Sequence, residues 1–184
     1  MASPSPANPK YIGEELAKTI KAQLPHLHED RPALAVRSEV VNTPLQTYTE
    51  MDLKWAKEAS RGGVGGLTQY RVGRILALEE LRLKYGETLP CTVQVIRLSR
   101  ETAIVTLPGE MFVEHGLAIK KASPFANTLV IELSNDREKI ASVPLRKSFS
   151  EGGYEIVYSR LESGAGEMLV SAAMRLLKEL KETE

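Results

Sequence analysis

The chain has 184 residues, of which 42% are hydrophobic and 26% are charged, with 24 basic and 24 acidic side chains. This length and composition predict one globular domain with a sizeable core, and the zero formal net charge argues against a general attraction to nucleic acid or to an anionic membrane. The single cysteine, Cys91, excludes an internal disulfide framework. No apolar run reaches the roughly 18 residues that a membrane-spanning helix needs.

Residues 1–9 are small, polar and rich in proline, and they lack the apolar segment of a signal peptide. We interpret them as a flexible lead-in to a single α/β domain over residues 10–184. The sequence does not assign the protein to a cellular compartment. Residues 10–24 carry apolar side chains three or four positions apart, which predicts an amphipathic helix that ends at Pro25. These side chains are Tyr11 or Ile12, Leu16, Ile20 and Leu24.

The middle of the first half predicts strands followed by a short helix. Residues 33–48 are rich in β-favouring residues with rough alternation, which indicates one or two strands. Thr49 and Asp52 have the spacing of a capping box and predict the start of a helix over residues 51–60. We expect that helix to bury Leu53, with Trp55 as a second candidate.

A long helix closes the first half. The glycine-rich residues 61–66 predict a loop, and residues 67–86 have the longest helical pattern before the midpoint. Its core face holds Ile75, Leu78 and either Leu81 or Leu83, and Gly86 is the expected stop.

The second half alternates more tightly between element types. The pattern predicts strands over 91–99 and 102–109, a helix over 110–123, a buried strand over 128–135, a mixed segment over 136–162 and an amphipathic helix over 164–184. This order is typical of helices packed on a mixed β-sheet, a mixed α+β fold. In the last helix we expect Glu167 in the first turn and a core stripe of Met168, Leu169, Ala172, Leu176 and Leu180.

The three histidines do not make a metal site by themselves. His26 and His28 lie in PHLHED between a helix and a proline, which favours a loop, although an H-x-H pair on a strand could bind a metal. His115 stands without a second histidine four positions away, so the zincin pattern is absent and a helix-face role is favoured. The glycine clusters at 61–66 and 163–168 match neither a P-loop nor a dinucleotide-binding fingerprint.

Glu110 is the carboxylate with two good interpretations. It follows a Pro-Gly turn at the end of a predicted strand, where functional residues are common. In the first turn of a helix it would instead satisfy amide donors and favour the macrodipole. Tyr154 could line a pocket or be partly buried after its Gly-Gly turn, and Arg146 and Lys147 could meet a carboxylate or a lipid head group or simply be solvated.

Three stretches occur in an order that resembles a known family: TLPGEMF, then VPLRKSFSEGGYE, then SRLESGAGEMLV. They are similar to the C-terminal portion of the catalytic domain in the neutral/alkaline ceramidase family, and the chain looks most like the shorter bacterial ceramidase-like proteins. Members of that family are zinc amidohydrolases that cleave the amide of N-acylsphingosines. The resemblance implies zinc as the cofactor and a lipid amide as the substrate, and the family is often exported.

The resemblance assigns two positions of this chain to the family's zinc site. Glu110 matches the glutamate ligand, and Ser142 stands where the family has a tyrosine ligand. The two histidine ligands and an implicated serine belong to the N-terminal half of the family's domain and have no counterpart here. Tyr154 is the candidate for substrate binding, and no catalytic residue is assigned.

Two functional hypotheses follow. In the first, the chain is the glutamate-bearing part of a ceramidase-like amidohydrolase and is inactive or incomplete alone, so it pairs with an N-terminal half or with another copy of itself. In the second, it is a non-catalytic α/β interaction module or a degenerate remnant that pairs with another chain. Whether the chain is an enzyme by itself stays open.

Overall fold

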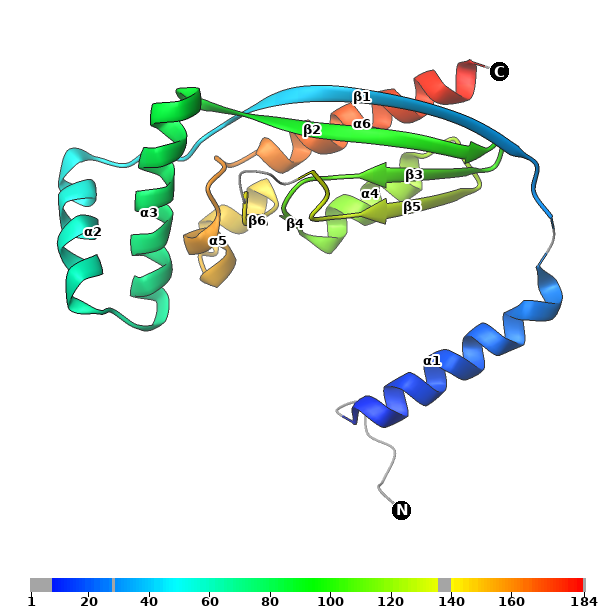
Figure 1. Cartoon of the computed structure of the whole chain (residues 1–184), viewed down its shortest axis with the longest axis horizontal. Helices are drawn as coiled ribbons and strands as arrows, with labels where there is room; N and C mark the ends of the chain where they lie inside the picture. Colours follow the sequence, from blue (N-terminus) through cyan, green and yellow to red (C-terminus); the bar gives the residue numbers. More distant parts are fainter. Residues whose placement is uncertain (1–7, 28, 136–139, 184) are drawn as a thin grey trace. The chain divides into compact units, whose positions relative to one another are not determined.

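The computed structural model describes residues 8–27, 29–135 and 140–183. Backbone contacts divide the chain into two compact units, residues 1–31 and residues 32–184. The first unit contains α1 (Pro9–Gln23) and the 3-10 helix η1 (Leu24–His26), which confirms the predicted first helix (Figure 1). Asn8 caps α1 by accepting a hydrogen bond from the Lys10 amide. In α1 the side chains of Ile12, Leu16 and Ile20 are exposed and Tyr11 is half-buried. His28 lies outside the described residues.

The second unit is built on a four-stranded mixed sheet in the order β1-β2-β3-β5 (Figure 1). The strand β2 (Thr88–Ser99) pairs antiparallel with both β1 (Pro32–Pro44) and β3 (Thr102–Thr106). The strand β5 (Asn127–Ile131) pairs parallel with β3. Because parallel neighbours need a crossover, the chain leaves the sheet after β3 and returns through α4 (Val113–Ala122). The sheet confirms the mixed α+β fold.

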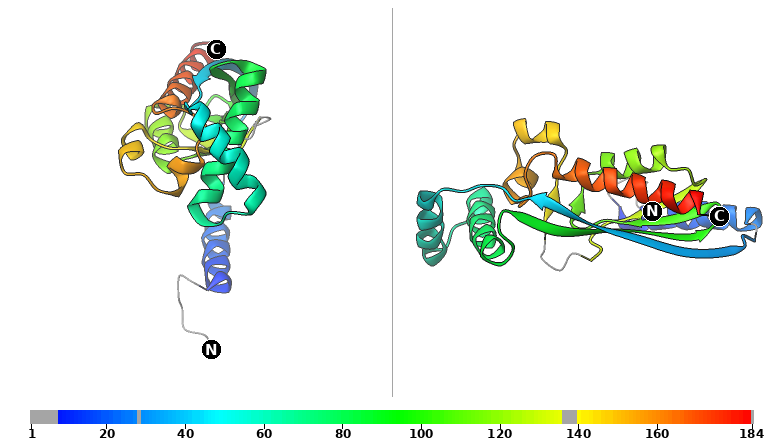
Figure 2. Two further views of the ribbon diagram at one scale, coloured as in Figure 1. Left: turned by 90° about the vertical axis from the view of Figure 1, so that its left-hand side faces the viewer. Right: turned by 90° about the horizontal axis from the view of Figure 1, so that it is seen from above.

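Two helices lie along one face of this sheet. The terminal helix α6 (Ala165–Glu182) packs on β1 and β2, and α4 packs on β5 and α6 (Figure 2). The core lies between them and the sheet, and each fully buried aliphatic side chain contributes about 1.5–3 kcal/mol. Its largest buried members include Leu89, Val93, Val95, Leu169, Leu177 and Leu180.

The predicted stripe of α6 is buried except at one position. Leu169, Ala172, Leu176 and Leu180 are buried, but Met168 is 40% exposed. Met168 precedes Leu169 by one residue, so its side chain is rotated by about 100° around the helix axis, to the edge of the buried face. Glu167 lies in the first turn as predicted.

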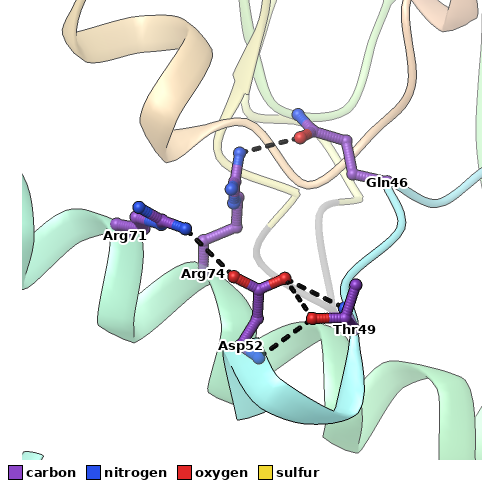
Figure 3. Close-up of polar contacts among 5 residues, drawn as sticks. All are labelled: Gln46, Thr49, Asp52, Arg71 and Arg74. Carbon is purple, nitrogen blue, oxygen red and sulfur yellow. Dashed lines mark hydrogen bonds and ion pairs between the residues drawn. The ribbon is translucent and has the colours of Figure 1, made fainter. Parts of the chain in front are cut away.

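The helices α2 (Glu50–Gly62) and α3 (Gly66–Tyr85) form a hairpin whose start is fixed by polar contacts (Figure 3). The Asp52 amide donates to Thr49 Oγ1 at 3.1 Å, and Asp52 Oδ2 accepts from the Thr49 amide at 3.0 Å, which confirms the capping box. Arg71 pairs with Asp52 at 3.0 Å. Hydrogen bonds from Thr49, with a smaller contribution from Arg71, lower the pKa of Asp52. Arg74 donates to Gln46 at 2.8 Å and ties α3 to the segment after β1.

Burial within this hairpin differs in part from the prediction. Ile75, Leu78 and Leu81 are buried, whereas Leu83 is 81% exposed. The buried residue of α2 is Ala56, while Leu53 is half-buried. Trp55 lies at the surface with the Arg71 guanidinium 5.0 Å from its ring centre, because the partner helix covers only the face that holds Ala56.

Two predicted elements of the second half are corrected. The helix predicted from residue 110 begins at Val113, and Glu110–Met111 form the short strand β4 instead. The strand predicted as buried is β5, an edge strand with exposed residues at alternate positions. Segment 136–162 contains β6 (Ser142–Val143), the 3-10 helix η2 (Arg146–Ser150) and the short helix α5 (Tyr154–Tyr158). Within the described part of the chain, every helix is too short or too polar to cross a membrane.

Candidate functional site

The site is built on the turn that follows β3. Leu107, Pro108 and Gly109 are buried, and Glu110 is the first exposed residue after them. Gly109 has φ +75°, and a Cβ there would lie 2.8 Å from the Ala141 carbonyl oxygen. Only glycine accepts this backbone conformation together with so close a neighbour. Gly109 is therefore required for β4 to reach the segment that carries Ser142.

Backbone hydrogen bonds hold the turn from both sides. On one side the Leu133 amide donates to the Gly109 carbonyl at 3.0 Å. On the other side the Glu110 amide donates to the Ala141 carbonyl at 2.9 Å. A turn fixed on both sides leaves Glu110 little backbone freedom, so its carboxylate projects from a rigid support.

The turn places Glu110 beside Ser142. The strands β4 and β6 are parallel, with Glu110 and Ser142 as register partners. The Ser142 hydroxyl, which is buried, donates a hydrogen bond of 2.9 Å to Glu110 Oε2. Ala141, immediately before Ser142, has φ +67°, a left-handed conformation that costs a non-glycine residue energy. Strain of this kind persists only where the surrounding contacts fix it, as the Glu110–Ala141 hydrogen bond does here.

Tyr154, the predicted substrate-binding residue, begins α5 and belongs to a cluster of three tyrosines. Its ring is 4.6 Å from that of Tyr70 and stacks at 5.5 Å on that of Tyr158, measured between ring centres. Partial desolvation, the neighbouring Tyr70 and the negative charge of Glu110 raise the pKa of Tyr154 above its ordinary value. Glu110 therefore acts electrostatically on Tyr154. The tyrosine is 39% exposed, so it lies at the surface.

His115 is the one histidine in the unit that contains Glu110, and its polar contact is with another segment. His115 is buried in α4, and its Nε2 lies 3.4 Å from the Pro144 carbonyl oxygen. A Cβ on Gly166 of α6 would approach His115 Nε2 to 2.5 Å, so this glycine lets α6 pack directly on the imidazole. His115 thus fills the α4–α6 contact, and His26 belongs to the other unit.

Of the remaining polar candidates, Glu167 contacts Arg146. Glu167 Oε1 accepts a hydrogen bond of 2.9 Å from the Arg146 amide, so the first turn of α6 holds the start of η2. Arg146 and Lys147 are both exposed, in agreement with a solvated position. The Arg146 guanidinium lies over Gly164, where φ is +95° and a side chain would collide with it.

Glu132 is a carboxylate that sequence reasoning missed. It accepts a hydrogen bond of 2.8 Å from the Met111 amide, next to Glu110 along the chain. It also lines a groove of about 260 Å³ with residues of β4 and α4, among them Met111, Val113 and Leu117. Glu110 and Ser142 do not line this groove. In the sequence, the one sign that Glu132 could belong to a site is its position at the end of an apolar strand, and that signal is weak.

The donor atoms that the described residues place near Glu110 do not complete a zinc site. A catalytic zinc ion usually has three protein ligands of His, Glu, Asp or Cys type and an open position. Among residues 8–27, 29–135 and 140–183, no three such side chains come together. Glu110 offers one carboxylate, and the serine hydroxyl beside it is a poorer ligand than a phenolate. Further ligands would have to come from outside these residues.

Comparison with known proteins identifies the fold but no sequence family. No protein-family model matches the chain, and no curated protein matches it in sequence. Among solved structures, the neutral ceramidase from Pseudomonas aeruginosa matches 94% of this chain with a TM-score of 0.58 and 14% identity. A ceramidase complexed with C2 matches the same share with a TM-score of 0.58 and 12% identity. This chain spans 32% and 34% of those two chains, so it has a ceramidase-like fold over about a third of their length.

Proposed function

We propose that this chain supplies Glu110 as a zinc ligand to a ceramidase-like amidohydrolase that cleaves N-acylsphingosine-type lipids. The observation that carries the proposal is the pairing of Glu110 with Ser142, which are 32 residues apart in sequence and joined at 2.9 Å. These are the two positions that the family resemblance aligns with zinc ligands. A fold that sets them side by side is what a shared metal site requires.

The geometry around Glu110 suits a carboxylate that binds a cation. Its side chain is exposed, and its support is a turn held by hydrogen bonds on both sides. The Ser142 hydroxyl donates to Oε2 and orients the carboxylate. The second oxygen, Oε1, accepts no hydrogen bond from the described residues. A hydrogen-bonded partner of this kind fixes a ligand's direction before the metal arrives.

The proposal makes hydrolysis dependent on the rest of the ceramidase-like fold. One carboxylate does not hold zinc tightly, since the affinity of such sites comes from several ligands together. We therefore expect the purified chain alone to bind zinc weakly and to leave N-acylsphingosine intact. Activity is expected only where the chain is joined to, or complexed with, the portion that supplies the other ligands.

The test uses the full chain isolated from its native cells with whatever is bound to it. Zinc content and fatty-acid release from N-acylsphingosine are measured for the wild type, for Glu110→Gln and for the control Glu132→Gln. The control changes a nearby carboxylate that binds a backbone amide and leaves Glu110 in place. We expect Glu110→Gln to lose both zinc and hydrolysis while the control keeps them. Zinc and hydrolysis retained in Glu110→Gln would remove this residue from the ligand role.

A non-catalytic interaction module is the second candidate function. The observation that favours it is Ser142, because a buried serine hydroxyl replaces the phenol that the family uses as a ligand. A chain that had lost its metal chemistry could retain the fold and its contacts with other parts of a ceramidase-like protein. A native complex that contains no zinc, and whose stability is unchanged by Glu110→Gln, would support this function over the first.

A further inference from the structure

A groove of about 260 Å³ lies beside α4, where residues of β4, α4 and β5 line it. We call it the α4 groove. Its apolar lining consists of Met111, Phe112, Val113, Leu117 and Val130. Val113 is 70% exposed and Leu117 is 58% exposed, whereas the other three are half-buried. The α4 groove therefore joins the edge of the core to the surface, and its walls are open to a ligand.

One face of α4 forms the length of this groove. The α4 residues that line it are three or four positions apart: Val113, Gly116, Leu117 and Lys120. Residues at this spacing follow one another along one helix face, and seven residues at 1.5 Å extend over about 10 Å. A Cβ on Gly116 would lie 3.9 Å from Val130 Cγ1, so the missing side chain leaves room between α4 and β5. The space is thus a narrow trough that follows the helix.

The α4 groove carries one positive and one negative side chain, which lie at different ends. Lys120 is in the last turn of α4, and no described residue forms a hydrogen bond or an ion pair with its ammonium group. Glu132 lies at the end that holds Met111, whose amide donates to Glu132 Oε2 at 2.8 Å. The carboxylate thus has a partner within the chain, whereas the ammonium at the other end is available to a ligand.

The lining defines the chemistry of that ligand. Binding sites for small molecules combine apolar walls with a few polar groups that fix the ligand's orientation. The apolar face of α4 suits a hydrocarbon chain, and Lys120 supplies one positive charge for an anionic head. A carboxylate matches that single charge, whereas a phosphate monoester carries about −1.5 to −2 at pH 7 and would exceed it. The volume is below the roughly 300–1,000 Å³ of sites for drug-sized molecules, so a single slender chain fits best.

We propose that the α4 groove is a binding site for an alkyl carboxylate, a free fatty acid of medium chain length. Its hydrocarbon chain lies along Val113, Leu117 and Val130, and its carboxylate pairs with Lys120. Glu132 stands about 10 Å away along the helix, beyond the Debye length of about 8 Å at physiological salt, so it repels the bound carboxylate little. Neither Glu110 nor Ser142 lines the groove, so binding there requires neither zinc nor the proposed hydrolysis.

The test titrates decanoate, below its critical micelle concentration, into the purified full chain and follows amide chemical shifts by NMR. We expect saturable shifts at the residues of the α4 groove. Lys120→Gln should weaken decanoate binding by about tenfold, the effect of losing one charge-assisted hydrogen bond. The matched control is Lys121→Gln, which changes the next lysine, also exposed but not part of the lining. It should keep the affinity of the wild type.

A second variant tests the space of the groove without changing its charge. Gly116→Leu places a side chain beside Val130 and should weaken decanoate binding by about tenfold or more, the loss expected when a chain can no longer enter. Gly73→Leu, on α3 with open space around it, is the control and should bind decanoate normally. Circular dichroism verifies the fold of each variant. Because Lys120 is exposed, Lys120→Gln keeps the test decisive even where Gly116→Leu does not fold.

Two further ligands separate the contribution of the chain from that of the head group. Decyltrimethylammonium has the same hydrocarbon chain with a positive head, and acetate has the carboxylate without the chain. We expect neither to shift the groove residues at the concentration at which decanoate saturates them, because the site needs both the apolar contact and the negative charge.

Three outcomes would overturn the inference. Equal binding of decanoate to the wild type and to Lys120→Gln would show that Lys120 does not hold the head group. Tighter binding of decyltrimethylammonium, lost in Glu132→Gln, would assign the groove to a cationic ligand. Shifts on other surfaces with the groove residues unmoved would show that decanoate acts only as a detergent. Glu110→Gln should leave decanoate affinity unchanged, so this inference and the proposed function can fail separately.

Discussion

The Ser142 hydroxyl donates a hydrogen bond of 2.9 Å to Glu110 Oε2 across the parallel pair β4–β6. The serine is buried and the carboxylate is exposed, so the bond joins the interior of the unit to its surface. It fixes the direction of the residue that carries the proposed function.

Removal of this hydrogen bond should have a modest effect on stability. We expect Ser142→Ala to lower the free energy of unfolding by about 1 kcal/mol, because Glu110 Oε2 can turn to water in its absence. Denaturant unfolding monitored by circular dichroism measures the change. Ser60→Ala, at an exposed helical serine, is the control and should have a smaller effect. Equal losses in the two variants would show that the Glu110–Ser142 bond contributes nothing.

Gly109 should not tolerate a side chain. Gly109→Ala adds a left-handed alanine and a Cβ 2.8 Å from the Ala141 carbonyl oxygen. We expect a loss of about 2–4 kcal/mol in the free energy of unfolding. Gly73→Ala, in α3 with open space around it, should instead gain about 0.5–1 kcal/mol. The same unfolding experiment measures both variants. A Gly109→Ala variant that is more stable than the wild type would contradict the close approach of Gly109 to the Ala141 carbonyl.

Replacing Gly166 by alanine should destabilise the protein, although alanine is usually more stable than glycine in a helix. Alanine stabilises an open helical site, but at Gly166 its Cβ would lie 2.5 Å from His115 Nε2. We expect Gly166→Ala to cost about 1–3 kcal/mol. Gly116→Ala in α4, where the nearest atom would be 3.9 Å away, is the control and should not destabilise the chain. His115→Ala makes room for the new methyl group, so the double variant should be more stable than the sum of the two single changes predicts.

The capping box should stabilise the start of α2. Thr49→Ala removes the hydroxyl that accepts from the Asp52 amide at 3.1 Å. A lost N-cap of this type costs about 1 kcal/mol of unfolding free energy. Thr68→Ala, an exposed threonine within α3, is a matched control and should change little. A loss of the same size at both positions would show that the cap itself contributes nothing.

The titration of Tyr154 should report the charge of Glu110. Partial desolvation, Tyr70 and the negative charge of Glu110 raise the pKa of Tyr154, so Glu110→Gln should move this pKa down toward its ordinary value. Ultraviolet difference titration of each protein against its Tyr154→Phe variant isolates the phenol. Since the folded pKa is raised, the stability that comes from the neutral phenol is present at neutral pH and is lost as the pH rises through that value. Glu132→Gln is the control, and an equal change in both variants would contradict the specific effect of Glu110.

The local elements of this protein could be predicted because their signals lie close together in sequence. The capping box needs only Thr49 and Asp52, and the stripe that ends at Leu180 repeats at helical spacing. The mixed sheet followed from strands separated by helical segments. Each of these signals rests on backbone preferences or on the periodicity of burial, both of which act over a few residues.

Other features depend on which segments meet in space. The sequence placed Glu110 in a helix, but the Ala141 segment approaches Gly109 and draws Glu110 into a strand beside Ser142. Met168 and Trp55 remain exposed because the elements packed on their helices cover other positions.

The sequence by itself therefore determined which residues form most of the helices and strands, since those depend on neighbours along the chain. The resemblance of three stretches singled out Glu110 and Ser142 as candidates. Only the tertiary structure decided that these two side chains touch and that Gly109 lies against the Ala141 carbonyl. Both facts depend on contacts between distant segments, for which the order of residues along the chain carries no local signal.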